Sequence, residues 1–209
     1  DLNGNPIGLV LDATQGVTIQ GLQIKNFFLG ILIKSGATNN TVGGNRSLGS
    51  GPVGQGNLIS GNVYTGVQLQ NPGTSNNEIL GNLIGTSILG DSADGNANGI
   101  VLAVGATNNV IGGSHSAGVC DGPCNLISGN DYGVWIPTGD CLGNQILGNF
   151  IGTNLSGNTS LGSQTRGIYF AGGAHDNVIG GANPSADCSG PCNPVSYTHL
   201  RAHETVLDL

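Results

Sequence analysis

The sequence repeats itself with a period of about 68 residues, and this repetition constrains the fold more than any other feature. NLISGN occupies residues 57–62 and returns at 125–130. NEILGNLIGT at 77–86 returns as NQILGNFIGT at 144–153. A fixed period of this kind marks proteins in which small units stack one on another and share a continuous core. We therefore expect a solenoid with nearly three partial copies of one unit.

Each unit divides into two similar halves, and each half holds three short apolar pieces. The pieces follow the patterns G-[IV]-x-[ILF], N-x-[IV] and N-[LF]-I-[GS], and they are separated by Gly and Asn. Gly and Asn tolerate the backbone angles of tight turns. An amphipathic helix needs a 3.6-residue period over ten or more residues, and this pattern is absent. Three short strands per turn predict an all-β parallel β-helix of about five to six turns, which we call coils.

Successive side chains of a strand point to opposite faces, so the apolar positions of each pattern are expected to line the interior. The expected interior residues of the first strands are Val67, Leu69, Ile100, Leu102, Val134, Ile136, Ile168 and Phe170. The second strands contribute Ile79, Ile111, Ile146 and Ile179, and the third strands contribute Ile59, Ile84, Ile127 and Ile151. At the turn before each third strand stand Asn57, Asn82, Asn125 and Asn149. We expect these asparagines to adopt the left-handed conformation and to hydrogen-bond from coil to coil.

Inserted loops fall at two places in the repeat. Residues 43–56 and 112–124 separate a second strand from a third strand. Residues 86–98 and 153–166 separate a third strand from the next first strand. The two loop positions alternate from coil to coil, which explains why the repeating unit spans two coils.

The recurring GNLISGN and GNxIGT segments resemble those of large secreted bacterial proteins with right-handed parallel β-helix repeats, within the pectate-lyase-like superfamily. The resemblance covers roughly residues 8–193. It implies a right-handed β-helix and a location outside the cell or at the bacterial surface. The superfamily contains lyases, hydrolases, epimerases and many non-catalytic surface proteins, so the fold alone does not select a function.

Composition excludes several partner classes. The chain has a net charge of -7 with only five Lys and Arg residues, so it lacks the clustered cations that nucleic acids and anionic membranes require. No apolar run reaches the length of a membrane span. Because the sequence contains no Met, we expect it to start inside a longer reading frame, with any signal peptide upstream.

The repeat is interrupted after Asn193. We therefore expect a β-helix fragment over residues 1–193, open at both ends, and a non-native tail over 194–209. The tail sequence PVSYTHLRAHET resembles the in-frame translation of a transposase adapter used in sequencing libraries, which indicates adapter read-through in a metagenomic gene. The alternative is a genuine C-terminal cap. The apparent acid–base cluster His199, Arg201, His203 and Glu204 lies in this tail and is discounted.

An outward-facing column on the first strands holds the candidate binding residues. It runs through Leu32, Gln68, Val101, Trp135 and Tyr169 on successive coils. Exposed aromatic rings suit the C–H patches of sugar rings. We therefore name Trp135 and Tyr169 as candidate carbohydrate-binding residues, with Asp140, Arg166 and His175 as possible neighbours. The alternative is that the two rings pack beneath the 153–166 loop.

Five cysteines occur as two C-x-x-x-C pairs and one single residue. Cys120 and Cys124 occupy one loop, and Cys188 and Cys192 occupy the equivalent loop one repeat later. Local disulfides suit a secreted protein and are the preferred interpretation. A zinc site shared by both pairs is disfavoured, because two coil spacings of about 4.8 Å each separate them. Cys141 is expected to be a free thiol.

Candidate metal and catalytic residues are few. The segment DSADGNANG at 91–99 contains Asp91, Asp94 and Asn96, which suggests a calcium loop, although a solvated loop is favoured. Lyase, polygalacturonase and epimerase motifs are not found, and no cofactor is expected. The sequence thus predicts a secreted or cell-surface scaffold, non-catalytic in this segment, that binds polysaccharide or a cell-surface glycan as an adhesin or stalk. The alternative is a fragment of a lyase, hydrolase or epimerase acting on acidic polysaccharide.

Overall fold

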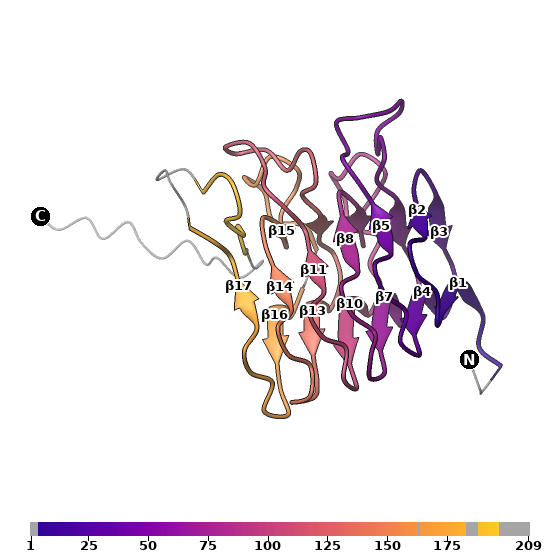
Figure 1. Ribbon diagram of the computed structural model, residues 1–209. Helices are drawn as coiled ribbons and strands as arrows, with labels where there is room; N and C mark the ends of the chain where they lie inside the picture. The colour runs from indigo at the N-terminus through magenta and orange to yellow at the C-terminus, as the bar shows by residue number, and fades with distance from the viewer. Residues whose placement is uncertain (1–3, 163, 183–187, 197–209) are drawn as a thin grey trace, which may run out of the picture.

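The computed structural model describes residues 4–162, 164–182 and 188–196, and these residues form a right-handed parallel β-helix (Figure 1). Three parallel sheets run along the solenoid. The first sheet contains β1 (Ile7–Asp12), β4 (Leu29–Lys34), β7 (Thr65–Gln70), β10 (Asn98–Ala103), β13 (Tyr132–Ile136) and β16 (Arg166–Phe170). The second contains β2 (Thr18–Ile19), β5 (Thr41–Gly43), β8 (Glu78–Leu80), β11 (Val110–Ile111), β14 (Gln145–Ile146) and β17 (Val178–Ile179). The third contains β3 (Gln23–Lys25), β6 (Leu58–Ser60), β9 (Leu83–Ile84), β12 (Leu126–Ile127) and β15 (Phe150–Ile151).

The strands stack in the register that the repeats predict, so equivalent residues form columns along the axis. Val67 pairs with Ile100 and Ile100 with Val134, for example. Most predicted interior residues are fully buried in one continuous core. Ile168 and Phe170 are partly buried, and Ile179 is 51% exposed, because no described strand of the first or second sheet lies beyond β16 or β17. The predicted fold class and core are confirmed.

Buried asparagines form three ladders along the corners of the solenoid. In each ladder the backbone N–H, the side-chain amide or both donate to Oδ1 of the asparagine in the next coil, over 2.8–3.2 Å. The ladders comprise Asn40, Asn77, Asn109, Asn144 and Asn177; Asn57, Asn82, Asn125, Asn149 and Asn193; and Asn62, Asn96 and Asn130. These bonds satisfy buried backbone groups that a sharp corner leaves without sheet partners.

The expected ladder through Asn57, Asn82, Asn125 and Asn149 is therefore present, but its predicted left-handed conformation is wrong. None of these four residues has a positive φ. The left-handed angle falls on the preceding residue at two of these corners, with φ of 63° at Gly81 and 58° at Gly148. The glycine makes the turn, and the asparagine after it can then point its amide along the ladder.

Outside the third sheet, loops cover a second apolar core. Leu83, Leu126 and Phe150 are at most 1% exposed and pack with Cys120, Cys124 and other apolar residues of the loops. The neighbouring side chains Ile84 and Ile127 belong to the main core on the opposite face of the same strands. Thus the third sheet is buried on both faces.

Loops from alternate coils contact each other above this second core. The backbone N–H of Arg46 donates to the carbonyl of Gly122 over 2.8 Å, and the Arg46 guanidinium donates to the carbonyl of Cys120. Burial lowers the pKa of Arg46 to about 10. One repeat later, His115 and Gly190 exchange two backbone hydrogen bonds. The loops therefore form a continuous layer instead of separate protrusions.

The chain after Asn193 is described as far as Ser196. Val195 pairs in parallel with Ile151, the position that a further third-sheet strand would occupy. Residues 197–209, which include His199, Arg201, His203 and Glu204, lie outside the described residues. The assignment of 194–209 as a non-native tail remains a prediction.

Candidate functional site

The candidate site lies on the outer face of the first sheet, near β13 and β16. Trp135 pairs with Tyr169 and with Val101 in the register expected from the sequence. Both aromatic residues are half-buried. The preceding members of the column, Leu32 and Val101, are 5% and 4% exposed, so neighbouring side chains cover much of this face further along the solenoid.

The ring of Tyr132 stacks with the rings of both Trp135 and Tyr169, although Tyr132 is not a member of the outward-facing column predicted from the sequence. Its ring centroid lies 5.6 Å from that of Trp135 and 5.9 Å from that of Tyr169, with the planes within 30° of each other. A strict two-residue alternation would place Tyr132 and Trp135 on opposite faces. Gly133 prevents this, because both it and Val134 face the interior at the corner where the strand begins. A side chain at Gly133 would meet Ile151 and Gln164, so glycine is required there.

Arg166 is the charged member of this group, which we call the aromatic cluster (Tyr132, Trp135, Arg166 and Tyr169). The guanidinium carbon lies 4.5 Å from the Tyr169 ring centroid and 5.1 Å from that of Tyr132. Its Nη1 donates a 2.6 Å hydrogen bond to the Tyr132 hydroxyl. Cation–π contacts of this kind hold a guanidinium flat against the rings. Within the described part of the chain Arg166 forms no salt bridge with a carboxylate.

The cluster combines apolar rings with hydrogen-bonding groups at its edge. The tyrosine hydroxyls and the exposed guanidinium of Arg166 supply polar groups. The indole Nε1 of Trp135 is buried and has no partner among the described residues. Chemically, such a surface can bind a ligand that has both C–H faces and hydroxyl groups.

The other residues considered as neighbours of Trp135 have different partners. His175 Nδ1 lies 2.8 Å from Asp176 Oδ2 on an exposed turn. Asp140 bonds the Thr138 side chain, which lowers its pKa. The 153–166 loop packs Leu155 against the second core, while Arg166 at the end of this loop contacts the aromatic rings.

Four of the five cysteines lie in the loop layer and form disulfides there, whereas Cys141 lies in the main core. Disulfides join Cys120 to Cys124 and Cys188 to Cys192. The first disulfide packs in the second core, and the Cys192 carbonyl contacts Nε2 of the buried His115 over 2.9 Å. Cys141 is a buried free thiol. These contacts fix the loops over the third sheet.

The 86–98 loop pairs its acidic residues with other side chains. Asp94 forms a 2.6 Å salt bridge with Lys25, and Ser87 donates a 2.6 Å hydrogen bond to Asp91. This hydrogen bond from Ser87 lowers the pKa of Asp91. Among the described residues, no group of three or more His, Cys, Asp or Glu side chains lies close enough to hold a metal ion.

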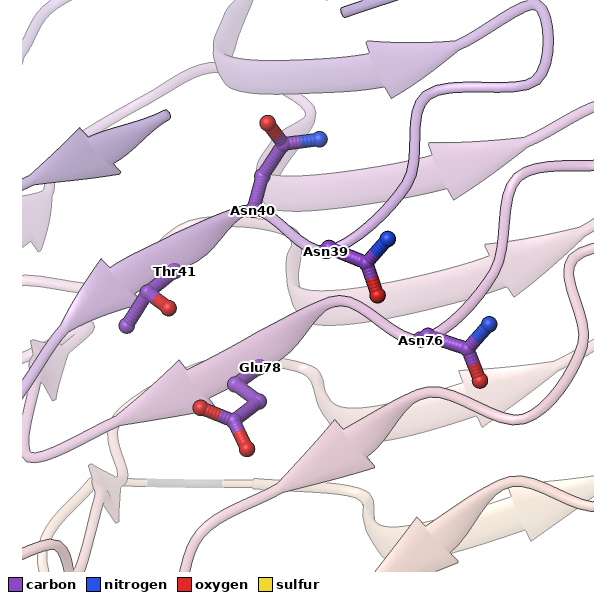
Figure 2. A pocket seen from close by; sticks show the side chains of 5 residues that line it. All are labelled: Asn39, Asn40, Thr41, Asn76 and Glu78. Carbon is purple, nitrogen blue, oxygen red and sulfur yellow. The ribbon is translucent and has the colours of Figure 1, made fainter. Parts of the chain in front are cut away.

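A small polar cleft of about 240 Å³ opens beside β5 and β8. Figure 2 shows the amides of Asn39 and Asn76 next to each other, with Thr41 and Glu78 on the strands that follow. Asn40 also lines the cleft, but its amide belongs to a ladder and bonds Asn77 and Thr14. With Glu78 as its one ionisable residue, the cleft offers hydrogen bonds but not paired acid and base groups.

No family model, no curated protein and no solved structure matches this chain. Across the part of the chain that the structure covers, no helix has the length and apolar character needed to cross a membrane.

Proposed function

We propose that this chain is a secreted or cell-surface β-helix that binds a glycan through the aromatic cluster and has no catalytic role in this segment. The observation that carries the proposal is the stacking of Tyr132, Trp135 and Tyr169 beside Arg166. Rings of this kind contact the C–H faces of sugars, and the polar groups at their edge bond hydroxyls. The two disulfides support a location in an oxidising compartment.

Within this proposal, the resemblance of the repeats to the pectate-lyase-like superfamily supports a bacterial surface or secreted origin. An enzyme of that superfamily would need a carboxylate set against a histidine or arginine beside the ligand. Arg166, the cation of the cluster, is instead bonded to a tyrosine hydroxyl. This arrangement favours binding over acid–base chemistry.

A glycan array tests the proposal. We expect the described chain to bind at least one class of oligosaccharide. Trp135→Ala and Tyr169→Ala should each weaken that binding by about tenfold or more, which corresponds to ~1.4 kcal/mol. Leu89→Ala is the matched control, because Leu89 is 63% exposed and lies in the 86–98 loop. Absence of any binding, or an equal loss in the control, would contradict the proposal.

A further inference from the structure

Two equivalent contacts join the loops above the third sheet, and they differ in one side chain. Arg46 and His115 occupy the same place in the repeat, as the last residues of GGNR and GGSH. The backbone N–H of Arg46 donates to the carbonyl of Gly122 over 2.8 Å. The backbone N–H of His115 donates to the carbonyl of Gly190 over 3.1 Å, and Gly190 is the counterpart of Gly122 one repeat later. The same loop contact is therefore made once with arginine and once with histidine.

Both side chains strengthen their contact by binding carbonyl groups. The guanidinium of Arg46 donates to the carbonyl of Cys120. In the second contact, Nε2 of His115 lies 2.9 Å from the carbonyl oxygen of Cys192, on the partner loop. The other ring nitrogen, Nδ1, lies 2.8 Å from the carbonyl oxygen of Ser116. His115 is only 6% exposed, so water has little access to either nitrogen. Each ring nitrogen of His115 thus faces a hydrogen-bond acceptor.

This arrangement fits one protonation state of the imidazole ring. A neutral imidazole has one N–H and one lone pair, so it can donate to only one of the two carbonyls. Its unprotonated nitrogen would lie at hydrogen-bond distance from a second acceptor, which leaves a buried polar contact unsatisfied. The protonated ring carries an N–H at both nitrogens and satisfies both carbonyls. The ring of Phe150 lies perpendicular to the imidazole, with centroids 4.9 Å apart, and holds the imidazole in this orientation.

The charged groups around His115 keep their charge near neutral pH. Asp121 on the same loop lies close enough for its charge to interact with His115, and it accepts hydrogen bonds from the hydroxyl and backbone N–H of Ser116. Such a carboxylate is ionised throughout the range of roughly pH 5 to 8. Arg46, whose charge interacts with that of Asp121, stays protonated over this range because burial lowers its pKa only to about 10. Within the described part of the chain, β15 and residues 188–192 add no titratable side chain, since both cysteines of that segment are disulfide-bonded.

We propose that the contact between His115 and residues 188–192 is a pH-sensitive switch in the loop layer, complete when the imidazole is protonated and weakened when it is neutral. Histidine is the side chain that ordinarily changes charge between roughly pH 5 and 8. Because the closed contact favours the protonated ring, its stability is greatest at acidic pH and is lost as the pH rises. The equivalent contact of Arg46 does not change over this range. A rise in pH therefore loosens the loop layer at one end of the second core, next to Phe150, and leaves the layer intact at Arg46.

Hydrogen exchange measured by NMR on the whole chain tests this difference, with the Arg46 contact as a control in the same sample. Protection factors, corrected for the intrinsic effect of pH on exchange, are compared at about pH 5.5 and about pH 8. The amides of His115 and Gly190, which bond each other's carbonyls, should lose about tenfold in protection at the higher pH. The amide of Arg46 should keep its protection. Nitrogen chemical shifts of the His115 ring report its protonation independently.

Two substitutions separate a switch from a merely structural contact. His115→Arg copies the first contact and should keep the protection of Gly190 while removing its dependence on pH. His115→Gln cannot be protonated and should give a weaker contact that is equally weak at both pH values. Three results would overturn the proposal: an equal loss of protection at Arg46, a pH dependence that persists in His115→Arg, or a His115 ring that is still neutral at about pH 5.5.

Discussion

The first and third sheets are built from the same coils, yet their outer faces differ. Outward residues of the third sheet, such as Leu126 and Phe150, are buried beneath the loop layer. Outward residues of the first sheet vary: Leu32 and Val101 are 5% and 4% exposed, whereas Trp135 and Tyr169 are half-buried and Val10 is 45% exposed. The repeats specify the interior of both sheets equally. The inserted loops decide which outer face becomes a second core and which remains partly exposed.

We expect the largest difference in stability when one aromatic residue is replaced on each face. Phe150→Ala should destabilise the protein by about 3–5 kcal/mol, because it leaves a cavity in the second core. Trp135→Ala should cost clearly less, because Trp135 is only half-buried, but it should reduce glycan binding. Urea denaturation measures both stabilities. Equal losses from the two variants would show that the two faces are packed alike.

Removing the disulfide between Cys120 and Cys124 tests whether the loop layer affects ligand binding on the first sheet. Replacing Cys120 and Cys124 together by serine should destabilise the protein by about 2 kcal/mol, as expected for a short closed loop. Glycan affinity should not change, because the aromatic cluster lies on the first sheet. Thermal unfolding and calorimetry on the same samples check the two statements. A parallel fall in affinity would mean that the two faces are coupled.

A substitution at Gln164, near the start of β16, should increase the stability of the protein. Following the spacing of Asn62, Asn96 and Asn130, the fourth ladder position falls on Gln164, whose amide is buried with no partner for either polar atom among the described residues. Gln164→Asn restores the ladder geometry and should add about 1 kcal/mol, the net value of a typical hydrogen bond. Thermal unfolding of this variant, with Gln164→Ala as control, gives the answer. A destabilised Asn variant would exclude continuation of the ladder.

The smallest expected effect is the contribution of Asp121, a residue of the loop layer, to stability at different pH values. Burial alone would raise the pKa of Asp121, but hydrogen bonds from the Ser116 hydroxyl and backbone N–H outweigh it and hold that pKa below its usual value. The stabilisation is present above the unfolded-state pKa of ~3.9 and is lost as pH falls through the lower folded-state value. Asp121→Asn should therefore cost under about 1 kcal/mol at pH 7, because the carboxylate is partly solvated, and less at pH 3. Unfolding curves at both pH values measure this; an equal cost at both would contradict it.

The features that recur in the sequence could be predicted, because each copy supports the alignment of the others. The interior columns through Ile84 and Ile100, the loop positions and one asparagine ladder follow directly from the repeat. The ladder through Asn40 has the same spacing, because each of its asparagines stands two residues before the interior residue of a second-sheet strand, and it follows by the same logic. The ladder that begins at Asn62 is harder to recognise, because its asparagines stand four or five residues before the next interior residue.

Features that depend on contacts between non-repeating residues could not be predicted. Tyr132 does not belong to the outward column, because Gly133 faces the interior and interrupts the two-residue alternation at the start of β13. Arg166 is the first residue of β16 and pairs with Tyr132 in the sheet register, so its position follows from the repeat, but the contact of its guanidinium with the two rings depends on side-chain orientation that the repeat does not encode. The second core likewise depends on which loops meet across coils, and loop sequences such as 43–56 and 112–124 differ too much to show this.

The pairing of loops across alternate coils limits how this molecule can change in length. Arg46 on one loop bonds Cys120 on the next loop of the same kind, two coils further along. Loss of a single coil would bring loops of different kinds together and leave the buried guanidinium of Arg46 without its acceptor. Loss or duplication of a whole 68-residue unit would instead join equivalent surfaces and continue every asparagine ladder. Viable insertions and deletions in such a chain should therefore come in steps of two coils.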